Sequence, residues 1–158
     1  GRLERMVRLF SAAPTPYNLD AWDGYPAERE RTYAVFKAAG ARPIVLAGDS
    51  HAAWVNELKD ASGQRVAAEF GATAISSPSL GDAVGGMDIG ALFAAQNDEV
   101  LFNDQNGKGF TLLRLTKTDV TGEIMAMSTV MAKPYEVRTV KRFRVTREGD
   151  GLSAPVEA

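Results

Sequence analysis

One short stretch, Ile44 to His51, restricts the possible folds of this chain more than any other. Its sequence is IVLAGDSH, four consecutive apolar residues that follow Pro43 and lead into Gly-Asp-Ser-His. An unbroken apolar run of this length is typical of a strand covered on both faces, as in an α/β fold or a layered sandwich. Ligand sites gather at the carboxyl ends of such strands. We therefore predict a buried strand that ends at a candidate site.

Asp49 and His51 are the candidate ligands at this strand end, and His51 is the only histidine in the sequence. The two residues are two positions apart, so a bent loop could direct a carboxylate oxygen and an imidazole nitrogen at one metal centre. By itself the pattern is weak, because a capping acid followed by a hydrogen-bonded histidine would look the same. Reasoning from these residues alone leaves both interpretations open.

The surrounding sequence favours the metal hypothesis. The stretch from Asn18 to Leu58, NLDAWDGYPAERERTYAVFKAAGARPIVLAGDSHAAWVNEL, closely resembles the alkaline phosphatase D family of calcineurin-like metallophosphoesterases. Two later blocks are similar to that family as well, VAAEFGATAISSPS at 66–79 and GKGFTLLRLTKTDVTGEIMAMSTV at 107–130. The resemblance extends from Asn18 to about Val145 and corresponds to the C-terminal part of the family's catalytic domain.

In this superfamily the last metal-binding motif is usually Gly-His-x-His, and the alkaline phosphatase D branch has Gly-Asp-x-His in its place. Gly48, Asp49 and His51 match that variant. The resemblance implies that Asp49 and His51 are ligands of a dinuclear or larger metal centre, with calcium and iron as the metals. Chemistry alone does not select the ion, since calcium prefers a carboxylate oxygen and imidazole suits a transition metal.

The implied activity is metal-dependent hydrolysis of phosphomonoesters or phosphodiesters, as in an alkaline phosphatase or phosphodiesterase. A dinuclear centre needs roughly six or more protein ligands, and this sequence matches only two, so we predict that these residues alone are inactive. The expected partners are a phosphoester substrate and either the missing N-terminal half of the catalytic domain or a second copy. Without such a partner, Ile44, Leu46 and residues 72–75 should form an exposed apolar patch. The family also implies a periplasmic or extracellular location.

Two other functions remain open. Gly48-Asp49-Ser50 could be the nucleophile block of a GDS-type serine esterase. Such an enzyme needs a histidine base brought in from elsewhere, and the single histidine is the immediate neighbour of Ser50, which argues against it. The other alternative is a non-catalytic, β-rich binding or structural module that retains the strand and its loop.

A few further residues are weaker site candidates. Asn56, or its neighbour Glu57, could orient His51 in the way that metal-bound imidazoles are commonly oriented, although a solvated strand face explains them equally well. Trp22 and Asp23 belong to a turn-rich segment that could border the metal cleft. Ordinary turn and packing roles are the favoured interpretation of these two residues.

Composition limits the possible classes further. The 158 residues are 45% hydrophobic, enough for one core, and give no reason to expect a second domain. A net charge of -2 provides no electrostatic surface for nucleic acid or an anionic membrane. No apolar run approaches the ~20 residues of a membrane span. Because cysteine is absent, disulfides and thiolate metal sites are excluded.

Local signals predict the secondary structure. They indicate a short helix or strand within residues 1–17, a helix from Pro26 to about Ala39, a hairpin of 54–58 with 65–70, a buried strand at 72–77 and a helix at 89–96. Strands are expected at 101–102, 110–115, 124–130 and 136–145.

The predicted fold class is α/β: part of a metallophosphoesterase layered β-sandwich with flanking helices and a β-rich C-terminal half. Residues 1–148 belong to that domain, and residues 149–158 form a disordered tail.

Overall fold

The structure, a computed structural model, describes residues 20–85 and 87–158. The helix or strand predicted within residues 1–17 lies outside these ranges. Although the sequence predicts a single core, the chain separates into two compact units, Gly1–Gly40 and Ala41–Ala158. Each unit is described by itself.

The first unit contains the helix that the sequence predicts. A short 3-10 turn, η1 (Trp22–Gly24), precedes α2 (Pro26–Ala38). Pro26 occupies the first turn of α2, where its missing N–H group leaves no hydrogen bond unmade. The helix stops where Gly40 adopts a φ of 58°, a left-handed conformation that glycine adopts readily.

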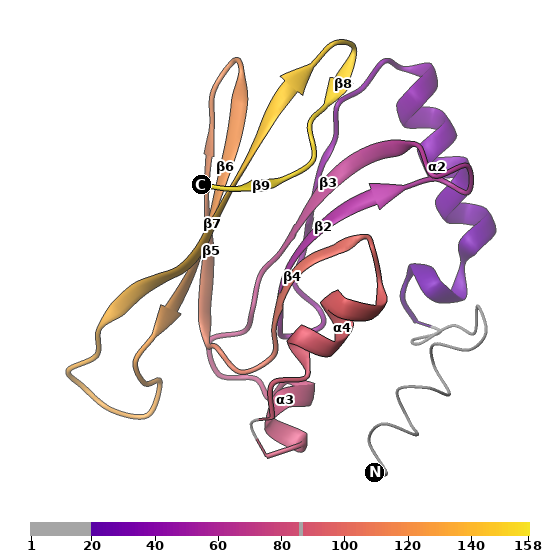
Figure 1. Ribbon diagram of the computed structural model, residues 1–158. Helices are drawn as coiled ribbons and strands as arrows, with labels where there is room; N and C mark the ends of the chain where they lie inside the picture. Colours follow the sequence, from indigo (N-terminus) through magenta and orange to yellow (C-terminus); the bar gives the residue numbers. More distant parts are fainter. Residues whose placement is uncertain (1–19, 86) are drawn as a thin grey trace. The chain divides into compact units, whose positions relative to one another are not determined.

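The second unit consists of two β-sheets and two short helices (Figure 1). In chain order its elements are β1 (Ile44–Ala47), β2 (Ala53–Lys59), β3 (Arg65–Gly71), α3 (Leu80–Ala83), α4 (Gly90–Gln96), β4 (Val100–Asp104), β5 (Gly109–Leu115), β6 (Asp119–Met127), β7 (Val137–Glu148), β8 (Gly151–Leu152) and β9 (Val156–Glu157). The first sheet has the order β1-β3-β2-β4, and the second has the order β5-β6-β7-β8, with β9 also paired to β7. The described chain is therefore a mixed α/β structure that is rich in strands.

The hairpin of β2 and β3 forms as predicted, because the residues between the strands make a self-contained turn. Asp60 Oδ1 accepts hydrogen bonds from the backbone N–H groups of Ser62 and Gln64, both at 2.9 Å. Gly63 adopts a φ of 81°, which the turn requires and which other residues rarely adopt. The antiparallel register places Val55 opposite Phe70.

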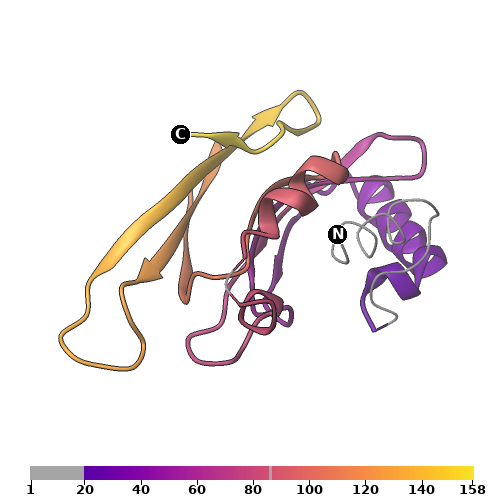
Figure 2. The ribbon, with the colours of Figure 1, turned by 60° about the horizontal axis from the view of Figure 1, so that its bottom comes forward.

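The hydrophobic core lies between the two sheets, which face each other as separate layers (Figure 2). Its buried members from the first sheet are Ala53, Val55, Ala68 and Phe70, and those from the second are Ile124, Phe143 and Val145. Alternate residues of a strand point to opposite faces, so the buried residues alternate along β2 (Ala53, Val55, Glu57) and along β6 (Gly122, Ile124, Ala126). The Phe70 ring also lies directly over Gly122 of β6, where a β-carbon would come within 3.0 Å of three ring carbons.

The environment of β1 differs from the predicted one. The sequence predicts a strand covered on both faces, but β1 is the edge strand of its sheet and pairs only with β3 in the described chain. Leu46 is 63% exposed and Ala47 is exposed too. An apolar run of four residues predicts the strand correctly, but it does not determine which part of a protein covers that strand. Of the predicted apolar patch, only Leu46 and Ile75, at 52% exposure, are exposed, because Ile44 packs against the core cluster and residues 72–74 are half-buried.

Two other predicted segments also differ. Residues 72–77 do not form a buried strand, because the ladder ends at Gly71 and the following segment is irregular, with Ile75 exposed. Residues 149–158, predicted as a disordered tail, contain β8 and β9 instead. Gly149 turns the chain at a φ of 54°, and β9 then pairs with Phe143 and Arg144 of β7.

None of the helices in the described ranges has the length and apolar character needed to cross a membrane.

Glu69 of β3 is a half-buried carboxyl group on the sheet face opposite to the core. Burial raises its pKa above 4.5, and the nearby Glu99 raises it further, whereas a hydrogen bond from Asn56 Nδ2 at 3.0 Å opposes the shift. A raised pKa means that the folded state disfavours the ionised form. The charge of Glu69 therefore lowers the stability of the fold increasingly as the pH rises above 4.5.

We expect Glu69→Gln to be more stable than the wild type at pH 7, because the amide keeps an acceptor for Asn56 and carries no charge. The difference should shrink as the pH falls towards 4, where the wild-type carboxyl becomes protonated. Urea unfolding midpoints at several pH values measure this, with the exposed Glu136→Gln as the control. A stability difference that does not vary with pH would contradict the assignment.

Candidate functional site

The topology of the first sheet brings three loops to one edge. β1 and β3 are parallel neighbours, so their carboxyl ends leave the sheet at the same edge. β2 begins at that edge and β4 ends there, since Ala53 is paired with Asp104. Residues 48–51, 72–79 and 104–108 therefore meet, although they are far apart in the sequence.

His51 is held in a defined orientation at this edge. The residue closes a tight turn, with its N–H donating to Gly48 O at 3.2 Å, and its backbone φ of 57° is left-handed. Its ring Nδ1 lies 2.8 Å from the carbonyl oxygen of Pro78. A carbonyl can only accept, so Nδ1 carries a proton, and in the neutral imidazole Nε2 then keeps its lone pair. This is the tautomer that a metal ligand needs when Nε2 binds.

Asp49 lies in the same turn, and its side chain is exposed. A carboxylate is an oxygen donor and an imidazole a nitrogen donor, so the two residues differ in the metals that they suit. Within residues 20–85 and 87–158 there is no group of three His, Cys, Asp or Glu residues that could hold a metal ion. The described residues thus fit a part of a ligand set, one oxygen and one nitrogen, and a centre of several metals would need ligands from elsewhere.

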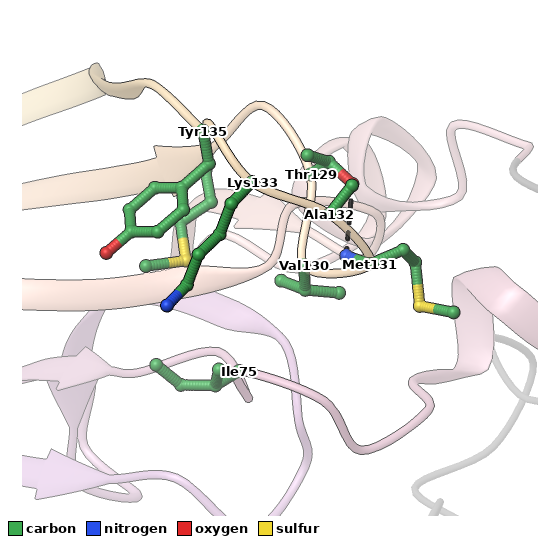
Figure 3. A pocket seen from close by; sticks show the side chains of 8 residues that line it. Ile75, Thr129, Val130, Met131, Ala132, Lys133 and Tyr135 are labelled. Atoms are coloured by element: carbon green, nitrogen blue, oxygen red, sulfur yellow. Dashed lines mark hydrogen bonds between the residues drawn. The ribbon is translucent and has the colours of Figure 1, made fainter.

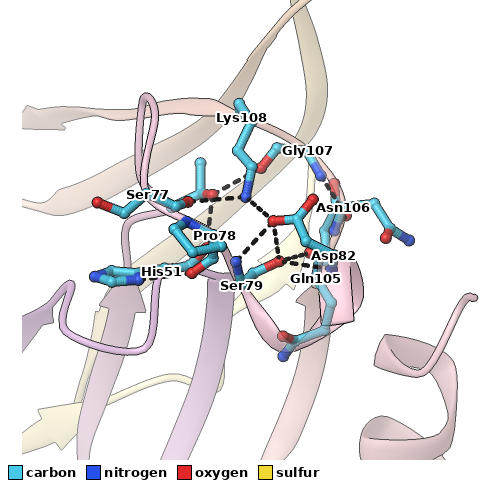
Figure 4. Close-up of polar contacts among 11 residues, drawn as sticks. His51, Ser77, Pro78, Ser79, Asp82, Gln105, Asn106, Gly107 and Lys108 are labelled. Carbon is cyan, nitrogen blue, oxygen red and sulfur yellow. Dashed lines mark hydrogen bonds and ion pairs between the residues drawn. The ribbon is translucent and has the colours of Figure 1, made fainter. Parts of the chain in front are cut away.

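The segment that carries Pro78 is itself fixed by a network of polar contacts (Figure 4). Lys108 Nζ donates to Ser77 O at 3.1 Å and to Asp82 Oδ2 at 2.6 Å. Asp82 Oδ2 also accepts the backbone N–H of Ser79 at 2.7 Å. The Ser79 hydroxyl group caps α3 and contacts the carbonyl of Gln105.

Asp82 is ionised throughout the usual pH range. The hydrogen bond from Lys108 and then that from the Ser79 N–H lower the pKa of Asp82 from 3.8 to about 2. A lowered pKa means that these contacts stabilise the fold above about pH 4 and lose that effect as the pH falls from 3.8 towards 2. Asp82 therefore keeps its negative charge at neutral pH.

A second contact ties the His51 turn to the same loop. The hydroxyl group of Thr73 lies 3.1 Å from His51 O and 2.7 Å from Gly107 O. Because a hydroxyl group has only one proton, it shares that proton between the two carbonyls or alternates between them. Either way Thr73 links the backbone of the turn to residues 104–108.

Ser50 does not have the surroundings of a catalytic serine. Its hydroxyl oxygen accepts a hydrogen bond from the indole N–H of Trp54 at 2.8 Å. The Nδ1 atom of His51 faces Pro78 instead. A serine nucleophile requires a base that takes its proton, and an indole N–H is a donor only. These contacts disfavour the serine esterase alternative.

The weaker site candidates have other partners or belong to the other unit. Asn56 donates to Glu69, and Glu57 forms an ion pair with Arg65 at 2.5 Å, while a backbone carbonyl orients His51. The alternation of β2 explains this, because Asn56 points away from the core and Glu57 points towards the second sheet. Trp22 is half exposed in the first unit, and the side chain of Asp23 lies outside the described part of the structure. The predicted cleft role of these two residues stays a prediction.

A separate cavity of about 420 Å³ lies between Ile75 and the segment that joins β6 to β7 (Figure 3). Its lining residues are Ile75, Met127, Thr129, Val130, Met131, Ala132, Lys133 and Tyr135. Most of these side chains are apolar, and neither Asp49 nor His51 is among them. The cavity therefore contributes no ligand to the candidate site.

Sequence reasoning missed the residues that support His51. Pro78 acts through its backbone, which no side-chain pattern reveals. One signal was nevertheless present: Ser79 and Asp82 have the spacing of a capping box, which marks the start of a helix. The importance of Lys108 follows only from the meeting of β3 and β4 at one sheet edge.

Comparison with known proteins gives a consistent result. Residues 2–124 match the family model described as PhoD-like phosphatase. Alkaline phosphatase D of Bacillus subtilis (strain 168) is 37% identical over 155 aligned positions, and the match covers 90% of this chain and 24% of that protein. A solved structure described as "Structure of PhoD" matches with a TM-score of 0.69 at 25% identity. The match covers 89% of this chain and 27% of the chain in that structure. The chain thus spans about a quarter of the length of these two relatives.

Proposed function

Because the chain belongs to the PhoD-like phosphatase family, we propose that it forms part of a metal-dependent phosphoester hydrolase in which Asp49 and His51 bind metal. The observation that carries the proposal is the hydrogen bond from His51 Nδ1 to Pro78 O, which leaves Nε2 with a free lone pair at the sheet edge. Metal-bound imidazoles almost always have such a partner on their other nitrogen. The two sheets would then be part of the layered sandwich of a larger metallophosphoesterase.

The proposed role of this chain is to supply two ligands of different chemistry. Asp49 offers an oxygen, which suits calcium, and His51 offers a nitrogen, which suits a transition metal such as iron. When bound, metal ions of this kind polarise the phosphoryl oxygens and lower the pKa of a coordinated water molecule. The chain's own contribution is to hold the imidazole in one tautomer and one direction before the metal and substrate arrive.

The remaining ligands would come from the rest of a longer polypeptide. Two features of this chain support that proposal: the described residues contain no complete ligand cluster, and β1 leaves its outer edge and Leu46 uncovered. A preceding segment that packed beside β1 would cover this edge and add ligands next to Asp49. We also propose the periplasmic or extracellular location that the family suggests.

We expect the purified 158-residue chain to show no appreciable hydrolysis of p-nitrophenyl phosphate, with or without added calcium and iron. A longer protein that includes this chain should hydrolyse the same compound, lose that activity on treatment with a chelator and regain it with metal. Robust metal-dependent turnover by the 158 residues alone would contradict the proposed sharing of ligands. An inactive longer protein would favour the alternative of a non-catalytic binding or structural module.

A further inference from the structure

The orientation of the His51 ring depends on one backbone carbonyl. Nδ1 lies 2.8 Å from Pro78 O, and the turn that carries His51 is exposed at the sheet edge. Any movement of Pro78 would therefore release the ring and allow the other tautomer. The question is what holds Pro78 in place.

Pro78 lies in the irregular segment between β3 and α3, so no sheet ladder or helix fixes it. Proline also lacks the N–H group through which most residues are anchored. Its two neighbours are anchored instead. Ser77 O accepts from Lys108, and the N–H of Ser79 donates to Asp82.

A single ion pair connects both anchors (Figure 4). Lys108 Nζ and Asp82 Oδ2 are 2.6 Å apart, so the residue that holds Ser77 is bonded to the residue that holds Ser79. The side chain of Lys108 is only 15% exposed, unlike that of a typical surface lysine. An exposed ion pair commonly contributes little to stability. This pair is distinctive because it joins the residues that hold the two neighbours of Pro78, whose carbonyl contacts His51.

We propose that Lys108 and Asp82 are positioning residues for His51, acting through the carbonyl of Pro78. Without the pair, the contact of Lys108 with Ser77 O is no longer tied to the contact of Asp82 with Ser79, so Pro78 shifts and Nδ1 loses its acceptor. The prediction for the ring follows from these contacts alone. Its consequence for metal binding rests on the proposed function of His51.

The sole histidine makes the test direct. In the 158-residue chain labelled with [15N]histidine, each ring-nitrogen signal comes from His51. At pH 8, well above the usual histidine pKa of about 6.5 and with EDTA present, the wild type should show a protonated Nδ1 and an unprotonated Nε2. Lys108→Met keeps the apolar stem of the side chain and removes its charge, and we expect it to shift the ring towards the Nε2–H tautomer. Lys117→Met, at an exposed turn, is the matched control and should match the wild type.

A folded Lys108→Met variant, as shown by a dispersed amide spectrum, whose ring keeps the wild-type Nδ1–H signal would overturn the proposal. If Lys108→Met does not fold, the same measurement of the His51 tautomer is made on Asp82→Asn. The asparagine oxygen can still accept from the Ser79 N–H and preserve the helix cap, while the ion pair is lost. A wild-type tautomer in folded Asp82→Asn would equally overturn the proposal, and a shifted tautomer would support it.

Metal binding by a longer protein separates this inference from the proposed function. We expect Lys108→Met to weaken metal binding about 10–100-fold, the usual effect of losing a partner of a metal-bound histidine. Metal retained after dialysis, compared with Lys117→Met, is the measurement. A shifted tautomer with unchanged metal binding would support the positioning role and reject His51 as a ligand. An unshifted tautomer would reject the positioning role whatever the metal content.

Discussion

Replacing His51 by alanine in a longer, active protein is expected to reduce phosphoester hydrolysis at least ~10²-fold, since the loss of even an outer partner of a metal ligand has effects of that order. Alanine has no nitrogen to offer the metal. The fold should change little, because His51 lies in a turn at the sheet edge and outside the core cluster. Initial rates, bound metal and the thermal midpoint, measured on one preparation, test all three expectations.

Ser50→Ala is the matched control for this experiment. Ser50 is adjacent to His51. In the described part of the structure, its hydroxyl group has one hydrogen bond, from the indole N–H of Trp54. We expect near wild-type rates from Ser50→Ala if the metal proposal holds, whereas a serine esterase would lose its activity. Wild-type rates and metal content in His51→Ala would reject the assignment of His51.

Replacing Phe70 by alanine should destabilise the second unit by about 3–5 kcal/mol, the usual range for an aromatic side chain removed from a core. Phe70 is 1% exposed and belongs to the cluster that joins the two sheets. Its removal takes contacts from both sheets at once. Urea unfolding of the 158-residue chain measures the change, and Leu115→Ala, at a residue that is 67% exposed, should change stability by less than about 0.5 kcal/mol.

A second substitution shows whether this loss arises from the predicted packing. Gly122→Ala alone should also destabilise, because the new β-carbon would overlap the Phe70 ring. In Phe70→Ala/Gly122→Ala the same methyl group enters the vacated space. We therefore expect the double variant to be more stable than the sum of the single effects implies. Simple additivity would show that the ring of Phe70 does not lie over Gly122.

Local sequence signals correctly predicted the helix and the hairpin whose ends and turns are fixed by residues close together in the sequence. Pro26 and Gly40 mark the two ends of α2. The hairpin turn from Asp60 to Gly63 is closed by its own side chains, so the pairing of β2 and β3 follows from neighbouring residues. The same reasoning identified Asp49 and His51 as residues at a strand end, which is where the structure has them.

Features that depend on long-range pairing could not be predicted in this way. The parallel pairing of β1 with β3 brings Pro78 to His51 across 27 residues, and no local pattern specifies that contact. The C-terminal residues resembled a disordered tail because their apolar runs are short. Their two strands exist because β7 offers them a pairing edge.

The left-handed backbone of His51 has a consequence for how this sequence can change under selection. A left-handed conformation costs an ordinary L-residue roughly 1–2 kcal/mol, and glycine adopts it without that penalty. A library selected only for thermal stability would therefore be expected to favour glycine at position 51, whereas selection for the proposed hydrolysis would be expected to retain histidine. If His51 binds metal as proposed, stability and activity make opposite demands on this one residue, so a search for more stable variants should keep position 51 constant.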